Sequence, residues 1–210
     1  MIFSKEHKFV FVAIPKTGTR SVYNIMQKNY GAVRYQEHYK FIPDEYKDYY
    51  SFVTVRNPYD RAVSLWWSTC KREPRTDGKK GAGSNFKSSA GGDSLVHLLR
   101  WMNKKNAQYS GGSGMLLVSQ SAYFEKNKFD NILSFENLNA DFQKLPFLKG
   151  NDKLPKINTT TTVWGSNTTP RDPDYRKYLT PEAIELINKY YAEDFELLKQ
   201  YKKLSPDDAR

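Results

Sequence analysis

The sequence has a single cysteine and no long apolar run, and each shortage excludes a class of protein. Cys70 alone can form neither an intramolecular disulfide nor a cysteine-rich zinc site. No apolar stretch approaches the roughly 20 residues that span a bilayer, and the polar segment Met1–Lys8 does not have the pattern of a signal peptide. Histidines and carboxylates show no metal-ligand spacing. We therefore expect a soluble, cytoplasmic protein that needs no metal and binds no membrane.

Acidic residues are also in short supply, because 33 lysines and arginines face 23 aspartates and glutamates and leave a net charge of +10. This excess favours an anionic partner such as a polyphosphorylated nucleotide, an acidic glycan or a nucleic acid. The positive charge is not confined to one tail and no nucleic-acid-binding motif is present, so we expect no nucleic acid partner. With 210 residues and 15% aromatic side chains, the chain is long enough to form one domain over residues 1–210.

The stretch Phe9–Met26 has the pattern of a strand, a tight turn and a helix. Phe9–Ile14 is almost entirely apolar, as in a strand that is buried on both faces, and Ser21–Met26 begins a helix. Free N–H groups and the helix dipole then meet at one anion-binding spot. We call Pro15–Ser21 the loop motif. Its predicted phosphate-binding residues are Lys16, Thr17, Gly18, Thr19, Arg20 and Ser21. A plain structural turn with solvated charges is the alternative for this motif alone.

A second stretch, Phe52–Trp66, repeats the pattern. A β-rich run ends at Arg56, and Pro58 marks the first turn of a helix. Ser64 follows Arg56 by eight residues. We call Arg56–Ser64 the arginine motif and predict that Arg56 and Ser64 bind a second phosphate, with arginine as the planar partner that offers several donors.

Together these motifs resemble those of the sulfotransferases that use 3′-phosphoadenosine 5′-phosphosulfate (PAPS). The loop motif is similar to their 5′-phosphosulfate loop, and the arginine motif to their 3′-phosphate motif. Gln120, residues 129–145 and residues 178–201 extend the similarity to the branch that includes the Golgi carbohydrate sulfotransferases. The resemblance covers nearly the whole chain except about Glu73–Asp93.

The resemblance implies transfer of a sulfuryl group from PAPS to an acceptor hydroxyl, expected to belong to a carbohydrate. The product is then adenosine 3′,5′-bisphosphate, and the chemistry needs no metal. Lys16 is the expected catalytic cation beside the phosphosulfate. The resembling carbohydrate enzymes carry a histidine where His38 stands, and an ordinary histidine pKa of about 6.5 suits a base near neutrality. Glu37 is the alternative base.

Other polar residues have weaker predictions. His97 is expected to be packed or at the surface of a helix, and His7 to be exposed. Gln120 and Glu136 match family positions and are expected to be buried polar braces. The Thr-rich run around Trp164 is either part of the adenine or acceptor wall or a solvated loop.

Alternating strand and helix patterns predict an α/β fold, a P-loop-like short parallel sheet with helices on both faces. A further strand and several further helices are expected over Asn131–Phe135, Pro43–Tyr49, Asp93–Lys104, Leu138–Leu148 and Pro181–Tyr201. Glu73–Asp93 is rich in Gly, Ser and Lys and is predicted to be a mobile loop, either a lid or a spacer.

Two other functions remain open from the sequence. One is an ATP-using, kinase-like enzyme, although the loop motif lacks the first glycine of the ordinary nucleotide P-loop and no acidic partner for Mg²⁺ follows a strand. The other is a non-catalytic module that binds a nucleotide or a glycan.

Overall fold

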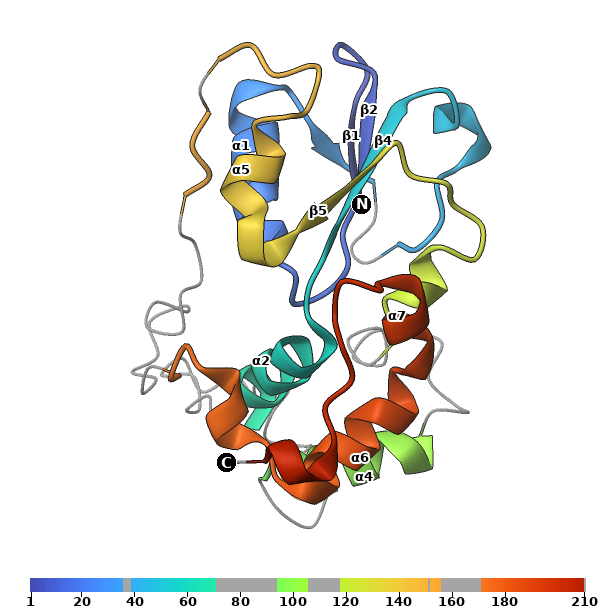
Figure 1. Cartoon of the computed structure of the whole chain (residues 1–210). Helices are drawn as coiled ribbons and strands as arrows, with labels where there is room; N and C mark the ends of the chain where they lie inside the picture. The colour runs from blue at the N-terminus through green and yellow to red at the C-terminus, as the bar shows by residue number, and fades with distance from the viewer. Residues whose placement is uncertain (36–38, 71–93, 106–117, 151, 156–170, 210) are drawn as a thin grey trace, which may run out of the picture. The chain divides into compact units, whose positions relative to one another are not determined.

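The computed structural model describes residues 1–35, 39–70, 94–105, 118–150, 152–155 and 171–209 (Figure 1). They form two compact units. Met1–Arg56 and Gln120–Ile157 make the first unit, and Asn57–Ser119 and Asn158–Arg210 make the second. The predicted loop over Glu73–Asp93 lies outside the described residues.

The first unit is built on a five-stranded sheet with the order β3-β1-β2-β4-β5. The strands are β1 (Ile2–Ser4), β2 (Phe9–Val12), β3 (Val33–Arg34), β4 (Tyr50–Val55) and β5 (Asn131–Ser134). Strands β2, β4 and β5 run parallel, whereas β1 is antiparallel to both β2 and β3. The predicted α/β class is confirmed. The sheet, predicted to be parallel, is mixed, and its parallel strands β2, β4 and β5 form the centre and one edge.

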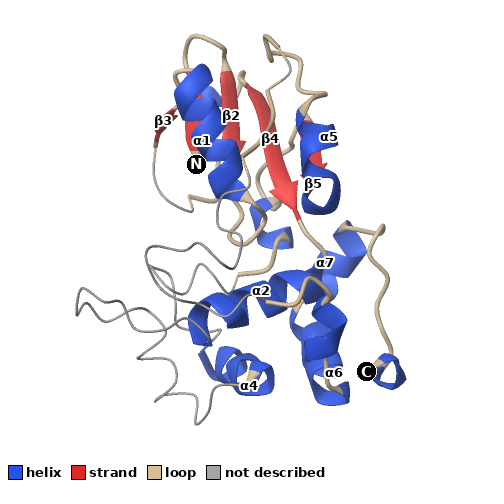
Figure 2. Cartoon of the chain, turned by 90° about the vertical axis from the view of Figure 1, so that its left-hand side faces the viewer, coloured by secondary structure: helices blue, strands red, loops and turns tan. Residues whose placement is uncertain are grey.

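Helices lie on both faces of this sheet. On one face lie α1 (Thr19–Asn29) and α5 (Leu138–Phe142) (Figure 2). Their buried side chains pack against aromatic side chains that alternate strand positions direct to that side. Phe11 and Phe52 stack there with their ring centroids 4.8 Å apart. On the other face, the short helix η1 (Asp44–Tyr46) places Tyr46 on Phe3 at 4.3 Å.

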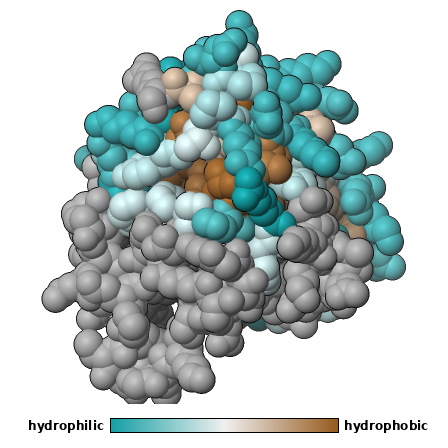
Figure 3. Space-filling model, turned by 90° about the horizontal axis from the view of Figure 1, so that it is seen from below, coloured by the Kyte–Doolittle hydropathy of each residue, from teal (hydrophilic) through white to brown (hydrophobic). Residues whose placement is uncertain are grey.

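The second unit is helical and has its own apolar core. It contains α2 (Pro58–Cys70), α4 (Leu95–Lys105), η5 (Tyr175–Tyr178), α6 (Pro181–Tyr190), α7 (Ala192–Leu197) and η6 (Pro206–Asp208). The core joins fully buried side chains of α2, α4 and α6, such as Val63, Leu99 and Ile184. Where the surface is described, the face in Figure 3 is mainly hydrophilic around a small apolar area.

Most predicted elements exist, but several end elsewhere than predicted. The strand over Asn131–Phe135 and the helix over Asp93–Lys104 are confirmed within two residues. The predicted helix Pro43–Tyr49 is a single 3-10 turn, Asp44–Tyr46. The predicted helix Leu138–Leu148 ends at Phe142, because Pro146 cannot continue a helix and disfavours helical geometry in the residue before it.

The predicted last helix is divided in two. Thr180 caps its start by accepting a hydrogen bond from the Ala183 N–H at 3.2 Å, with Pro181 next, as the sequence indicated. At Tyr191 the backbone leaves helical geometry (φ −113°, ψ 28°), and α7 continues to Leu197. No glycine or proline marks this break. Tyr191 and Phe195 are both buried in the core, so packing sets it. Across the described residues, no helix is long and apolar enough to cross a membrane.

Candidate anion-binding site

The loop motif lies between the end of β2 at Val12 and the start of α1 at Thr19. Gly18 is the N-cap of α1 and has a left-handed backbone (φ 83°), and no side chain caps the helix there. The first turn of α1 contains no acidic residue. Its backbone N–H groups and the helix dipole therefore suit an anion.

Gly18 is required for a second reason besides its backbone conformation. A Cβ atom at this position would lie 2.9 Å from Leu138 Cδ2 and 3.0 Å from Phe135 Cδ2. Both side chains follow β5, so the chain after that strand packs directly on the turn. Any larger residue would be strained and would also push the loop away from this packing.

A buried pair of hydroxyl groups holds the loop motif on β4. Thr17 is fully buried, and its Oγ1 donates to the Ile14 carbonyl at 2.8 Å. The same Oγ1 lies 2.6 Å from Thr54 Oγ1, so Thr54 donates to Thr17. The Thr17 hydroxyl thus serves the loop itself, and its backbone N–H is the group that suits an anion. Lys16, Thr19 and Ser21 are partly exposed, and Arg20 is exposed.

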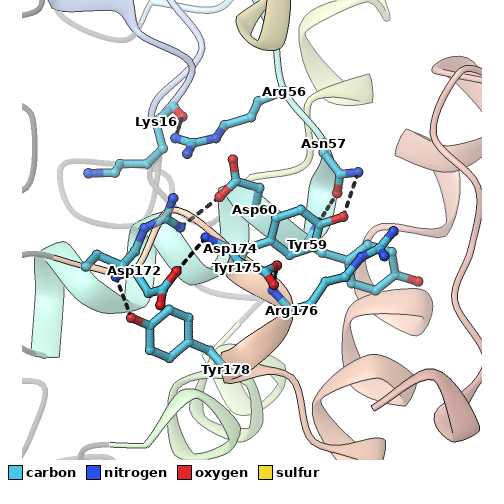
Figure 4. A network of polar contacts seen from close by, with 11 residues as sticks. Lys16, Arg56, Asn57, Tyr59, Asp60, Asp172, Asp174, Tyr175, Arg176 and Tyr178 are labelled. Carbon is cyan, nitrogen blue, oxygen red and sulfur yellow. Dashed lines mark hydrogen bonds and ion pairs between the residues drawn. The ribbon is translucent and has the colours of Figure 1, made fainter. Parts of the chain in front are cut away.

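Arg56 follows β4 directly and is bound to the loop motif through its side chain. Its Nη1 donates to the Lys16 carbonyl at 3.0 Å, as Figure 4 shows. The guanidinium carbon lies 3.9 Å from the centre of the Phe135 ring, which is a close cation–π contact. The structure therefore brings Lys16 and Arg56, both predicted from the sequence, into contact.

Gln120 holds the backbone of Arg56 where the strand ends. It is fully buried, its Oε1 accepts from the Arg56 N–H at 2.9 Å, and its Nε2 donates to the Arg56 carbonyl at 2.8 Å. The predicted role of Gln120 as a buried polar brace is confirmed. Glu136 was predicted wrongly, because it is exposed and accepts a hydrogen bond from the Ser134 hydroxyl at 2.6 Å.

The rest of the arginine motif lies in the second unit, where it forms the start of α2. Asn57 precedes the helix, and its Oδ1 accepts from the Tyr59 N–H at 2.9 Å, with Pro58 in the first helical position. Asp60 pairs with Arg171 at 2.7 Å, with both side chains mostly buried (Figure 4). Ser64 lies on α2 and is partly exposed.

Polar contacts also fix the chain that follows residue 170 in this unit. The Asp172 carboxylate accepts from Lys177 Nζ at 2.5 Å and from the Asp174 N–H at 2.9 Å. The hydrogen bond from Lys177 lowers the pKa of Asp172 below its ordinary value. The Asp172 N–H in turn donates to the Tyr178 hydroxyl at 2.7 Å (Figure 4). Arg171–Tyr178 is thus a well-defined segment.

The two described histidines, His7 and His97, contact neighbouring side chains of their own unit. His97 lies on α4, is partly exposed, and its Nδ1 is 2.7 Å from Ser94 Oγ, which agrees with the prediction of a packed or surface histidine on a helix. His7 was predicted to be exposed, but only 11% of its side chain is. Its ring packs edge-on against Tyr30 at 5.3 Å.

The predicted base, His38, and its alternative, Glu37, lie outside the described residues. The strand that precedes them, β3, is described and has a defined register. β1 pairs Ile2 with Phe11 of β2 and with Arg34 of β3, and the Tyr35 N–H donates to the Met1 carbonyl at 3.2 Å. The chain therefore leaves β3 at the same end of the sheet as β2 enters the loop motif.

Sequence reasoning missed two residues that the structure adds to the site, Thr54 and Phe135. Thr54 had a signal, since it is the polar residue within the apolar run Phe52–Val55. Phe135 lies in the stretch 129–145 that carries the family resemblance, but no pattern in that stretch indicates its contact with Arg56. The described part of the chain contains no group of three or more potential metal ligands. The backbone N–H groups and cationic side chains of the loop motif, together with Arg56, fit phosphate or phosphosulfate groups.

Comparison with known proteins gives one match. A family model described as "Sulfotransferase family" matches residues 1–202, which include both motifs. No curated protein and no solved structure matched the chain.

Proposed function

The chain belongs to the sulfotransferase family, and we propose that it transfers a sulfuryl group from PAPS to a hydroxyl group of a carbohydrate. The observation that carries this proposal is the contact between the two motifs. The Arg56 guanidinium donates to the backbone carbonyl of Lys16, so a cation for a second phosphate lies beside an uncapped helix start. A donor with phosphates at both ends of its ribose suits this arrangement.

In the proposed site, the backbone N–H groups at the start of α1 bind the 5′ end of the donor. Lys16, Thr17, Gly18, Thr19, Arg20 and Ser21 form this part of the site. PAPS, when bound, supplies an activated sulfuryl group on a phosphate that leaves as part of adenosine 3′,5′-bisphosphate. Lys16 is the proposed catalytic cation, because its charge adjoins the place where negative charge grows on the leaving phosphate.

The 3′-phosphate is assigned to Arg56 and Ser64. Guanidinium is planar and offers several donors, so it suits a phosphate better than an ammonium group does. The spacing of these two residues in the arginine motif, within the range 1–202 that the family model matches, supports this assignment.

His38 is the proposed general base for the acceptor hydroxyl, with Glu37 as the alternative. The support is the resemblance to carbohydrate sulfotransferases and the direction in which the chain leaves β3. A carbohydrate acceptor and a cytoplasmic location are further parts of the proposal. Incubation with labelled PAPS and a panel of sugars, and fractionation of cells, would test them.

Calorimetry with adenosine 3′,5′-bisphosphate, ATP and adenosine 5′-phosphate tests the donor. We expect the bisphosphate to bind most tightly, because only it engages both motifs. Preferential binding of ATP would overturn the sulfotransferase proposal in favour of a kinase-like enzyme. Tight bisphosphate binding without label transfer to any acceptor would point instead to a binding module.

A further inference from the structure

We propose that Phe135 is a positioning residue that strengthens recognition of the donor's 3′-phosphate by Arg56. This inference rests on the proposed PAPS-binding function. It starts from the register of the sheet, in which Val55 of β4 pairs with Ser134 of β5. Arg56 is the first residue after β4 and Phe135 the first after β5, so both side chains leave the sheet at the same end of two paired parallel strands.

The Phe135 ring contacts both phosphate-binding motifs. The Arg56 guanidinium lies over the ring, 3.9 Å from its centre. The Cδ2 and Cε2 edge of the same ring faces Gly18 at a distance that admits no Cβ there. Arg56 in turn contacts the loop motif directly, because its guanidinium donates to the Lys16 carbonyl at 3.0 Å. One aromatic side chain thus sets the position of the arginine against the turn of the loop motif.

Stacking has a consequence for how the arginine can bind an anion. A guanidinium carries five N–H donors, and the contact of its central carbon with the Phe135 ring is made without using up a donor as a conventional hydrogen bond would. The ring thus orients the donors but takes up none of them. Without it, Arg56 keeps its charge and its hydrogen bond to the Lys16 carbonyl but loses one of the contacts that restrict its orientation, and rotamer entropy then opposes phosphate binding more strongly.

Position 135 itself is held firmly. The Ser134 N–H donates to Asp141 Oδ2 at 3.0 Å, which ties the end of β5 to α5. The short helix η4 (Phe135–Asn137) follows at once. The backbone is therefore supported independently of the ring, and shortening the side chain changes the contact rather than the turn.

The test compares affinities for adenosine 3′,5′-bisphosphate and adenosine 5′-phosphate, which differ only in the 3′-phosphate. In Phe135→Leu, we expect the affinity ratio between the two nucleotides to fall about three- to tenfold, the range of a cation–π contact. Phe135→Tyr keeps the ring and should keep the ratio within about twofold. Phe124→Leu is a matched control, because it shortens an aromatic side chain whose ring contact is with Phe129.

A second measurement separates positioning from folding. In a background of Arg56→Ala, the change Phe135→Leu should not alter the ratio further, because the oriented group is already gone. If Phe135→Leu folds poorly, Phe135→Met gives the same comparison. An unchanged ratio in a folded variant, or an equal loss for both nucleotides, overturns the inference. A wild-type protein that ignores the 3′-phosphate overturns the proposed function instead.

Discussion

At the scale of single residues, Arg56 combines a predicted ligand contact with a structural one. Its guanidinium is predicted to bind the 3′-phosphate, and it already donates to the Lys16 carbonyl. Arg56→Ala should therefore weaken adenosine 3′,5′-bisphosphate binding by about ten- to a hundredfold, the range of a charge-assisted contact. Adenosine 5′-phosphate should lose only a few-fold, through the loosened loop. Calorimetry measures both values, and equal losses for the two ligands would make Arg56 purely structural.

Thr54 helps to hold the loop motif in place through its hydroxyl group. Thr54→Val keeps the shape and removes the hydroxyl that donates to Thr17. Thr17 still donates to Ile14, so the loss in unfolding free energy should be about 0.5–1.5 kcal/mol. Urea unfolding measures it, and Thr54→Ser, which keeps the hydroxyl, is the control. A Thr54→Val protein as stable as the wild type would show that the hydroxyl pair contributes nothing.

His38 is predicted to act on the acceptor and not on the nucleotide. His38→Ala should leave adenosine 3′,5′-bisphosphate affinity nearly unchanged and lower kcat by about 10²–10⁴. The wild-type rate should rise with pH through the histidine pKa, and the variant should lose that rise. Rates with labelled PAPS and a working acceptor decide this. Normal turnover in His38→Ala together with an inactive Glu37→Gln would move the base by one residue.

At the scale of elements, the break between α6 and α7 buries a tyrosine. Tyr191 is fully buried, and burial raises the pKa of its hydroxyl to about 12 from 10.0. Within the described structure, this hydroxyl has no hydrogen-bond partner. The folded state therefore favours the neutral form of the Tyr191 hydroxyl, so its ionisation destabilises the fold.

Alkaline unfolding measures this coupling. Below pH 10 both folded and unfolded Tyr191 are protonated; between pH 10 and about 12 only the unfolded form releases its proton, so stability falls as pH rises. Tyr191→Phe should remove about 2–3 kcal/mol of that loss. Near pH 8 the variant should be about as stable as the wild type, because no hydrogen bond is removed. The same alkaline loss in both proteins would contradict the explanation.

The elements also show how far sequence reasoning reaches. The apolar runs before Pro15 and Arg56 predicted β2 and β4, and Pro58 and the Thr180–Pro181 pair predicted the starts of α2 and α6, whereas α1 begins at Thr19, two residues before the predicted Ser21. Those signals are local. The antiparallel β1 and β3 are short, and the break at Tyr191 depends on packing against α2 and α4, which no local pattern records. For the same reason Lys16 and Arg56 could be predicted from their motifs. The contact between Phe135 and Arg56 could not, because it depends on the pairing of two strands that are far apart in the sequence.

At the scale of the whole molecule, the arginine motif contributes to both compact units. Arg56 is the last residue of the first unit's opening segment, and Asn57–Ser64 begins the second. Each unit has its own core, so the backbone at Arg56 needs the separate support that Gln120 gives it within the first unit. The family match over residues 1–202 covers both units.

The net charge of +10 predicts how salt acts on the proposed donor site. The Debye length shortens from about 10 Å at 0.1 M salt to about 3 Å at 1 M, so salt weakens attraction between the protein and an anionic ligand. The affinity for adenosine 3′,5′-bisphosphate should fall by about tenfold between 0.05 and 0.5 M KCl. Adenosine 5′-phosphate should lose less, and uncharged adenosine, as the control, should lose almost nothing. Calorimetric titrations at four salt concentrations give the three slopes. A common slope for all three ligands would mean that base and ribose contacts, and not the cations at Lys16, Arg20 and Arg56, carry the binding.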